Sequence, residues 1–345
     1  MWQRIEKQLS DQLPFVVYCK PRQTEIKAIF QKDKSLTKVS DFTESGFVFA
    51  PFESKDAAVL IKNDEHIHLE FSEEKQEISL TQPLAESNSG RDPYIKLLRK
   101  TIHEIESGAF TKVVLSRNLK VESKTSPITL FRRIVSLYRN AFCYLWYHPE
   151  VGMWLGATPE ILLQTENSNL TTMSLAGTLP YERIRKPNWS FKELDEQALV
   201  TKYILDALQG KVEELQESDL ETIRAGELVH LRTKITGVLQ SNKLNEIIDA
   251  LHPTPAVCGF PKKNTMNFIL DNEDYDRQFY AGFLGELNFG LNMATTLYVN
   301  LRCMQKIDNI MKIYVGGGVT KDSDPEKEWQ ETVNKSQTML RVLYN

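Results

Sequence analysis

The chain has few cysteines and no long apolar run. Its four cysteines lie far apart, at Cys19, Cys143, Cys258 and Cys303. With no CxxC pair and no cysteine–histidine cluster, the sequence indicates neither a zinc site nor a disulfide framework, and we expect reduced, buried thiols. No apolar run approaches the about 18 residues that a membrane helix needs, and the charged N-terminal segment is interrupted by Pro14. We therefore expect a cytoplasmic protein without a membrane partner.

Basic runs and nucleotide-binding motifs are also missing. The formal net charge is −4, and no basic stripe is interleaved with aromatic residues, so we expect no nucleic acid partner. Neither a GxGxxG turn opening a βαβ unit nor a GxxxxGK[ST] loop occurs, which leaves nucleotide cofactors without support. A chain of 345 residues with 41% hydrophobic content is long enough to bury a substantial core.

Short strand-like runs dominate the sequence. Residues 1–90 open with a helix and continue with FVVYC, EIKAIF, GFVFAPF and the alternating HIHLEF, and a polar stretch at residues 85–93 is typical of either a linker or a surface loop. Residues 91–345 contain many further strand-like runs, such as KVVLSRNLKV and ATTLYVNLR. Helices are predicted at residues 94–110, 193–209 and 245–251. Runs of strands separated by a few helices favour an α+β fold with antiparallel sheets.

The segment at residues 313–335 ends a strand in three glycines, which we interpret as a turn, and then begins a helix. A Ser323-x-x-Glu326 capping box, with Pro325 in the first turn, predicts that this helix starts near Asp324. A glycine run, a helix cap, two carboxylates and a lysine thus fall within one short stretch. We therefore interpret the segment as part of a ligand site.

Two of the predicted helices each carry a pair of carboxylates. On the last helix Glu328, Glu331 and Lys335 fall at i, i+3 and i+7, on one face. Glu193 and Glu196 repeat the three-residue spacing on the helix at residues 193–209. Oxygen ligands from two elements suit Mg2+. Solvated salt-bridge faces, or acidic partners of helix dipoles, give the same pattern, so the spacing alone leaves both interpretations open.

Five segments, in order along the chain, resemble one family. They run from Phe110 to Lys335, about two-thirds of the chain: FTKVVLSR, GATPEILL, SLAGTLP, LHPTPAVCGFP, and YAGFLGEL with the LRC and GGGVTKDSDPEKEWQETVNK that follow it. Together they resemble the chorismate-utilising enzymes, the family of isochorismate, salicylate, anthranilate and aminodeoxychorismate synthases. The resemblance implies two large antiparallel sheets packed together and flanked by helices. Residues 91–345 would form the chorismate-binding core, and residues 1–90, which match less clearly, would complete the same body.

The resemblance also implies the reaction. Members of the family displace or move the C4 hydroxyl of chorismate with different nucleophiles, and the water-using members carry a lysine where this chain has Lys112. Lys112 would be the base that deprotonates water for attack at C2, and Glu160 the acid that protonates the departing C4 hydroxyl. Such a lysine must be neutral and such a glutamate protonated, states that burial promotes. The family therefore favours an isochorismate synthase, feeding menaquinone or siderophore biosynthesis.

The same resemblance assigns the ligands. Glu196 and Glu331 would bind Mg2+, with Glu193 and Glu328 in support. The residues expected to contact or line the pocket for the two substrate carboxylates are Gly177, Thr178, His252, Tyr280, Arg302, Gly316, Gly318 and Lys335. Arg277 is expected only as a neighbour of the site. Gln197 stands where many members have histidine, and Cys258 where glycine is common, which bears on substrate positioning.

Three alternatives stay open beside an isochorismate synthase. A salicylate synthase would add pyruvate elimination, a step that the sequence separates poorly from isochorismate formation. An aminating synthase is disfavoured by Lys112 and by Ala176, which replaces the lysine that aminodeoxychorismate members carry before the GT pair. A chorismate-binding protein without turnover would lack the base, the acid or a metal ligand, and all three are present as residue types. We expect a monomer or a weak homo-oligomer.

Overall fold

Two large sheets form the body of the protein. The computed structural model describes residues 1–53, 57–71, 90–181, 187–225, 228–240 and 243–344. Within these residues every strand pairing is antiparallel. The two packed antiparallel sheets confirm the fold class predicted from the sequence. Part of the polar stretch, residues 85–89, lies outside the described residues.

The first sheet has nine strands in the described part of the chain. In spatial order they are β15 (Gly259–Phe260), β7 (Lys112–Glu122), β19 (Ile310–Val319), β18 (Cys303–Ile307), β9 (Gly152–Thr158), β8 (Phe142–His148), β1 (Phe15–Cys19), β2 (Glu25–Phe30) and β6 (Glu65–Glu70). Exposure alternates along β6, as its HIHLEF pattern predicts, whereas β1 is buried throughout.

The second sheet has ten strands among the described residues. Nine follow one another as β12 (Val212–Glu217), β14 (Leu228–Leu239), β11 (Asn169–Pro180), β10 (Ile161–Glu166), β17 (Ala294–Val299), β16 (Phe283–Phe289), β4 (Gly46–Ala50), β5 (Val59–Ile61) and β3 (Thr37–Lys38), and β13 (Glu221–Ala225) pairs with β14 outside that order. Strands from residues 15–70 thus pair with later strands in both sheets, β1 with β8 and β4 with β16.

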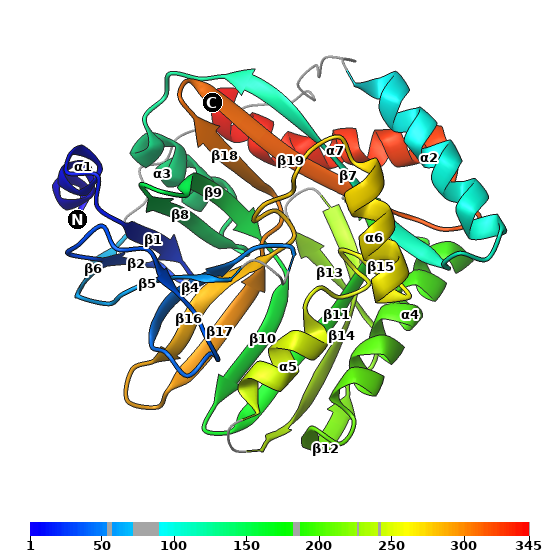
Figure 1. Cartoon of the computed structure of the whole chain (residues 1–345), viewed down its shortest axis with the longest axis horizontal. Coiled ribbons are helices and arrows are strands. Elements are labelled where there is room, and N and C mark those ends of the chain that lie inside the picture. The colour runs from blue at the N-terminus through cyan, green and yellow to red at the C-terminus, as the bar shows by residue number, and fades with distance from the viewer. Residues whose placement is uncertain (54–56, 72–89, 182–186, 226–227, 241–242, 345) are drawn as a thin grey trace.

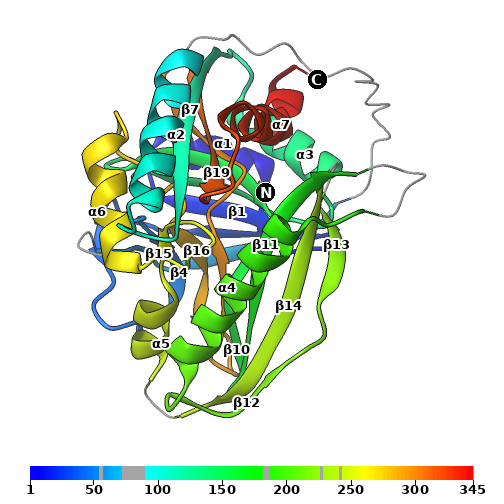
Figure 2. The ribbon, with the colours of Figure 1, turned by 90° about the vertical axis from the view of Figure 1, so that its right-hand side faces the viewer.

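Helices cover the sheets (Figure 1). They are α1 (Trp2–Ser10), α2 (Arg91–Glu106), α3 (Pro127–Leu137), α4 (Phe191–Leu208), α5 (Leu244–Leu251), α6 (Lys262–Asn272) and α7 (Pro325–Tyr344). In Figure 2, α4 lies across β11 and β14 of the second sheet, whereas α7 packs on β19 of the first. None of the helices in the described ranges is long and apolar enough to cross a membrane.

The helix boundaries differ in places from those expected. α4 and α5 lie within two residues of the predicted ranges, but α2 begins at Arg91 and ends at Glu106, earlier than predicted at both ends. The last helix starts at Pro325, as expected. Its cap is Asp324, whose Oδ1 accepts hydrogen bonds at 3.0 Å from the amides of Glu326 and Lys327, so the predicted Ser323 capping box is wrong. Ser323 accepts a bond from the Thr320 amide instead.

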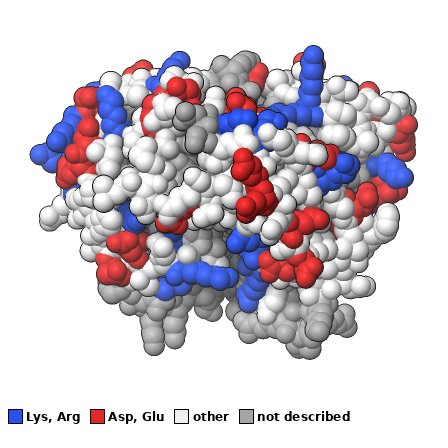
Figure 3. All heavy atoms as spheres, turned by 90° about the horizontal axis from the view of Figure 1, so that it is seen from below, with Lys and Arg blue, Asp and Glu red and all other residues white. Residues whose placement is uncertain are grey.

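Apolar side chains fill the space between the sheets. Aromatic residues of both sheets meet there, for example Phe49 of β4, whose ring centroid lies 5.1 Å from that of Trp146 in β8 and 5.9 Å from that of Trp154 in β9. Burying a side chain of this size contributes roughly 1.5–3 kcal/mol or more. A second apolar layer joins the outer face of the first sheet to α1, α3 and α7. On the face shown in Figure 3, acidic and basic side chains are interspersed.

Candidate functional site

A cavity opens where the two sheets meet beneath α4 and α7. Its empty volume, including the space at its open mouth, is about 780 Å³. The residues that line it include Val114, Glu160, Ala176, Gly177, Thr178, Glu196, His230, Val257, Tyr280, Arg302, Tyr314, Gly316, Gly317, Gly318, Glu331 and Lys335. They come from β7 and β19 of the first sheet, β11 and β14 of the second, both helices and the intervening loops. The structure thus brings together most residues that the sequence nominated.

Glu160 is a buried carboxyl in the cavity wall, at the turn between β9 and β10. Its side chain is almost fully buried, and burial raises its pKa to about 8, although Lys112, Lys335 and Arg302 pull in the opposite direction. The carboxyl group is therefore protonated at neutral pH. A neutral carboxyl that faces a ligand cavity can donate a proton to a leaving group.

Lys112, the first residue of β7, lies behind the cavity wall and not in it. Its side chain is 1% exposed, and Nζ lies 2.8 Å from Oε1 of Glu196, which does line the cavity. Burial alone would raise the pKa of Glu196, but the charges of Lys112, Lys192 and Lys335 outweigh it and lower the pKa. Glu196 is therefore a carboxylate, and Lys112 is its counter-ion.

The carboxylates of α7 face the same region, as their spacing predicted. Glu331 Oε1 lies 2.6 Å from Nζ of Lys335, and Glu328 forms an ion pair with Lys192 of α4. The second oxygen of Glu328, Oε2, is buried without a hydrogen-bond partner. Burial and the nearby charge of Glu331 raise the pKa of Glu328. Lys335 also donates a hydrogen bond of 2.9 Å to the carbonyl of Gly316.

The three glycines lie inside a strand, so the predicted turn is wrong. Gly316, Gly317 and Gly318 belong to β19 and pair with β7. β18 pairs with β19 only through Ile310–Ile313, so the opposite edge of the glycine segment has no strand beside it among the described residues. A Cβ on Gly318 would lie 2.7 Å from Oε1 of Glu196, which is too close. Glycine at position 318 therefore lets the strand approach the Glu196 carboxylate of α4.

Basic and phenolic groups also line the cavity. Arg302 and Tyr280 both line it, and a Cβ on Gly316 would lie 2.9 Å from the Tyr280 hydroxyl. Burial raises the pKa of Tyr280, so its hydroxyl stays protonated, while burial lowers the pKa of Arg302. A guanidinium, a phenol and the Lys335 ammonium suit an anionic group such as a carboxylate.

His230 of β14 is a cavity residue that sequence reasoning missed. Its Nδ1 lies 3.1 Å from both the Gly177 carbonyl and the Thr178 hydroxyl, so it holds the two predicted contact residues of β11. Burial and the charges of Arg302 and Lys335 lower its pKa to about 3, so the ring is neutral. Because a carbonyl accepts from Nδ1–H, Nε2 is left as an acceptor, and it has no hydrogen-bond partner. Only the strand register of β11 and β14 could have indicated this position.

Two predicted site residues lie elsewhere. His252 is not among the residues that line the cavity, because its Nε2 bonds to the carbonyl of Pro51 at 3.0 Å and its ring packs edge-on against Phe283. Glu193 turns its carboxylate back to the amide and hydroxyl of Ser190, forming the capping box of α4. Glu193 is therefore a helix cap, and its carboxylate is held by Ser190.

The two departures from the family pattern also lie behind the cavity wall. Gln197 is buried and donates hydrogen bonds of 2.8 Å to the hydroxyls of Thr201 and Thr233. Cys258 is buried with its Sγ 3.5 Å from the hydroxyl of Thr265. Neither residue lines the cavity.

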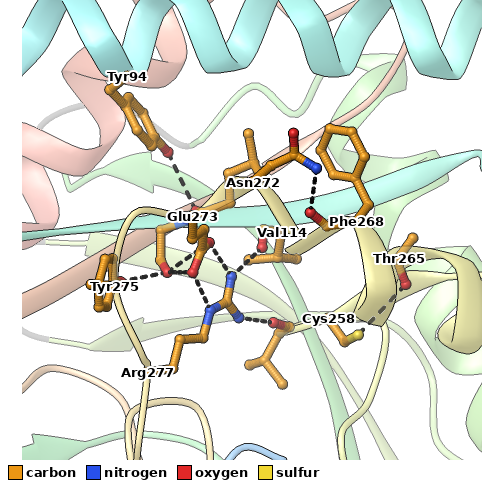
Figure 4. A network of polar contacts seen from close by, with 12 residues as sticks. Tyr94, Val114, Cys258, Thr265, Phe268, Asn272, Glu273, Tyr275 and Arg277 are labelled. Carbon is orange, nitrogen blue, oxygen red and sulfur yellow. Dashed lines mark hydrogen bonds and ion pairs between the residues drawn. The ribbon is translucent and has the colours of Figure 1, made fainter. Parts of the chain in front are cut away.

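Arg277 supports the cavity wall from outside (Figure 4). Its guanidinium forms an ion pair with Glu273 and donates to the carbonyls of Val114, at 2.7 Å, and Val257, at 3.0 Å. Glu273 accepts a hydrogen bond of 2.7 Å from the amide of Ser116. The ion pair, almost fully buried, thus ties two separate wall segments together, and Arg277 is a neighbour of the site, as expected.

This cavity belongs to a fold and a sequence family that are already known. Residues 17–344 match the family described as chorismate binding enzyme. The chain belongs to that family. The match covers nearly the whole chain, including the N-terminal strands whose sequence resemblance was weak.

Relatives and solved structures of chorismate binding enzymes agree with this assignment. The chain is 30% identical over 326 residues to isochorismate synthase MenF of Escherichia coli, covering 90% of this chain and 72% of MenF. It is 28% identical over 318 residues to isochorismate synthase DhbC of Bacillus subtilis, covering 85% and 79%. The crystal structure of DhbC from Bacillus anthracis superposes with a TM-score of 0.82 at 26% identity, covering 98% of each chain.

Three carboxylates of this chorismate binding enzyme lie close to the glycine segment of β19. Within the described ranges, no three His, Cys, Asp or Glu side chains already surround a metal position, because lysines engage these carboxylates. Oxygens of Glu328 and Glu331 nevertheless lie 3.5 and 3.7 Å from the point that a Cβ of Gly317 would occupy, and Glu196 is beside Gly318. With an unpartnered buried oxygen on Glu328, this all-oxygen set fits a hard divalent cation once the lysines move away.

Proposed function

We propose that the protein is an isochorismate synthase that converts chorismate to isochorismate with Mg2+ as cofactor. The observation that carries this proposal is the cavity itself, whose lining holds protonated Glu160 and the Glu196 carboxylate, with Lys112 paired to Glu196 behind the wall. Relatives named isochorismate synthase in Escherichia coli and Bacillus subtilis support it. A solved structure from Escherichia coli is described as the menaquinone-specific isochorismate synthase, and a relative in Vibrio cholerae is named vibriobactin-specific isochorismate synthase. The product would therefore feed menaquinone or siderophore biosynthesis in the cytoplasm.

The proposed chemistry is a displacement by water. Neutral Lys112 takes a proton from water as the water oxygen bonds to C2 of the ring. The ring double bonds shift, and the C4–O bond breaks as Glu160 gives its proton to the departing hydroxyl, which leaves as water. One water enters and one leaves, so substrate and product are isomers. A positioned acid or base of this kind contributes about 10²- to 10⁴-fold in rate.

The carboxylates of α4 and α7 would hold the metal. In this proposal Glu196 and Glu331 ligate Mg2+ directly or through water, and Glu328 supports them. The bound ion would supply positive charge for the ring carboxylate, which otherwise meets a cluster of glutamates. A cation on Glu196 would also release Lys112 from its ion pair with that carboxylate.

The rest of the cavity fits the two carboxylates of chorismate. Arg302 and Tyr280 would bind the pyruvyl carboxylate, together with the unpaired edge of the Gly316–Gly318 strand. Gly177 and Thr178 would contact the ring carboxylate. His230, held against both by its Nδ1, would present Nε2 as a hydrogen-bond acceptor to a ring hydroxyl.

The test is to incubate the purified protein with chorismate, with and without Mg2+, and to separate the products by chromatography. Isochorismate that forms only with Mg2+, and that returns chorismate when supplied as substrate, is the expected result. Salicylate with pyruvate would make the protein a salicylate synthase. Chorismate left unchanged under both conditions would make it a binding protein without turnover.

A further inference from the structure

A lysine bridges the two helices that carry the carboxylates. Lys192, in the first turn of α4, pairs with Oε1 of Glu328 in the first turn of α7. The Glu328 side chain is 1% exposed, and its Oε2 has no hydrogen-bond partner. Glu331 adds a second negative charge that acts on both Lys192 and Glu328. Lys192 is thus the cation that neutralises the buried end of this acidic cluster.

Lys192 also has space into which it can withdraw. Its side chain is 26% exposed and lines a second cavity, with an empty volume of about 1060 Å³, outside the first. The two cavities share Thr178 and Glu331, so the second adjoins the first. The long, flexible side chain can therefore leave Glu328 without a backbone movement, while the glutamate stays buried.

We propose that Lys192 is a built-in competitor of the metal: its ammonium occupies Glu328 in the metal-free enzyme and must withdraw before a divalent cation binds there. An ammonium on Oε1 and a divalent cation on Oε2 of the same buried carboxylate repel each other, so each weakens the binding of the other. This inference rests on the proposed function, because it assumes that the carboxylates are the Mg2+ site. It assigns Lys192 the role of setting metal affinity, which is separate from the acid–base chemistry.

The experiment measures Mg2+ binding directly, without turnover. Isothermal titration calorimetry of the full chain with Mg2+ alone would compare wild type, Lys192→Met, Lys192→Gln and Lys192→Arg. We expect the Met and Gln variants to bind Mg2+ about tenfold more tightly, within the range of about 5- to 150-fold that is usual for coupled sites. Lys192→Arg keeps a cation and should bind Mg2+ as wild type does. The matched control is Lys202→Met, because Lys202 pairs with Asp206 on an exposed face of the same helix.

Thermal unfolding supplies a second measurement. In EDTA, Lys192→Met leaves Glu328 without its counter-ion and should lower the Tm by about 5 °C, a loss that Mg2+ restores. Unchanged or weaker Mg2+ affinity in both neutral variants, with normal binding by wild type, overturns the role of Lys192 and leaves the proposed function intact. Wild type that binds no Mg2+ by calorimetry and forms isochorismate equally well in EDTA overturns both.

Discussion

Nζ of Lys112 lies 2.8 Å from Oε1 of Glu196, so the proposed base and a proposed metal ligand are each other's counter-ions. Lys112 is buried at the start of β7 and Glu196 lies in the second turn of α4. While they remain paired, the Lys112 amine is held by Glu196 and does not line the cavity. A cation bound to Glu196 would therefore free Lys112 for its proposed role as the base.

The first prediction concerns Lys112. We expect Lys112→Gln to lower kcat by about 10²- to 10⁴-fold, because the water loses its base. The substitution also leaves Glu196 buried without its partner and should lower the Tm. Adding Glu196→Gln should restore the Tm but not turnover, which separates the chemical role from the structural one. Turnover near the wild-type rate in Lys112→Gln would refute the assignment of the base.

The second prediction is a pH dependence set by Glu160. Its carboxyl must be protonated to act as the acid, and its pKa is raised to about 8 by burial. The active form is thus present below that pH, and kcat/KM should fall about tenfold for each unit above it. Glu160→Gln should lower kcat by about 10²- to 10⁴-fold and remove this alkaline limb from the residual activity. A fall in kcat/KM that begins near pH 4.5 in wild type would contradict the assignment. So would an alkaline fall that persists in Glu160→Gln.

Sequence reasoning predicted the fold well, because the fold depends on patterns that lie within single segments. The alternating residues of β6 and the periodic charges of α7 fix local structure, and the ordered motifs fix the family. Helix α3 was not predicted, although Ser126 caps it and Pro127 begins it. A short apolar segment of this kind is also typical of a buried strand. Helix α6 offers no side-chain cap, and nothing in its sequence signalled its start.

The site was predicted less completely, because side-chain direction depends on partners from distant segments. His252 was expected in the cavity and His230 was not considered. Both are buried histidines. The pairing of Thr178 with His230 across β11 and β14 places His230 in the cavity lining. Glu193 and Glu196 share one helix, but the first caps it and only the second reaches the cavity. A spacing rule cannot distinguish these outcomes.

A third prediction therefore compares Glu196 with Glu193. Glu196→Gln should abolish most of the activation by Mg2+, because a neutral amide is a poor ligand for a hard cation. Glu193→Gln removes only a reciprocal cap from α4 and should cost about 1 kcal/mol of unfolding free energy while leaving Mg2+ activation unchanged. Initial rates across a Mg2+ titration, with a thermal melt of each variant, provide the comparison. Loss of Mg2+ activation in Glu193→Gln alone would place the metal elsewhere.

The fourth prediction separates the two histidines. His230→Asn should reduce kcat/KM for chorismate by about tenfold or more, because it removes the acceptor in the cavity and loosens Gly177 and Thr178. His252→Asn should leave kcat/KM near wild type and lower the Tm, since it breaks a buried bond to the Pro51 carbonyl. Steady-state kinetics and melting curves of the two variants test both statements. If only His252→Asn lowers kcat/KM, then His252, and not His230, contributes to the substrate pocket.

The fifth prediction follows from the support that Arg277 gives to the cavity wall. Arg277 is 3% exposed, and its three nitrogens bond to Glu273 and to the carbonyls of Val114 and Val257. Lysine retains the charge but lacks the planar fork, so Arg277→Lys cannot hold both carbonyls and Glu273 together. We expect kcat to fall by about 10-fold or more through misplacement of the wall beside Lys112, with a smaller change in KM.

The matched comparison for Arg277→Lys is Arg232→Lys in β14. Arg232 pairs with Glu221 at a partly exposed position away from the cavity lining. Exposed ion pairs contribute about 0–1 kcal/mol, so Arg232→Lys should change neither kcat nor Tm measurably. If Arg277→Lys lowers the Tm while kcat and KM both stay at wild-type values, the buried pair stabilises the fold without positioning the site. A fall in kcat larger than the accompanying loss of folded protein would instead identify Arg277 as a positioning residue.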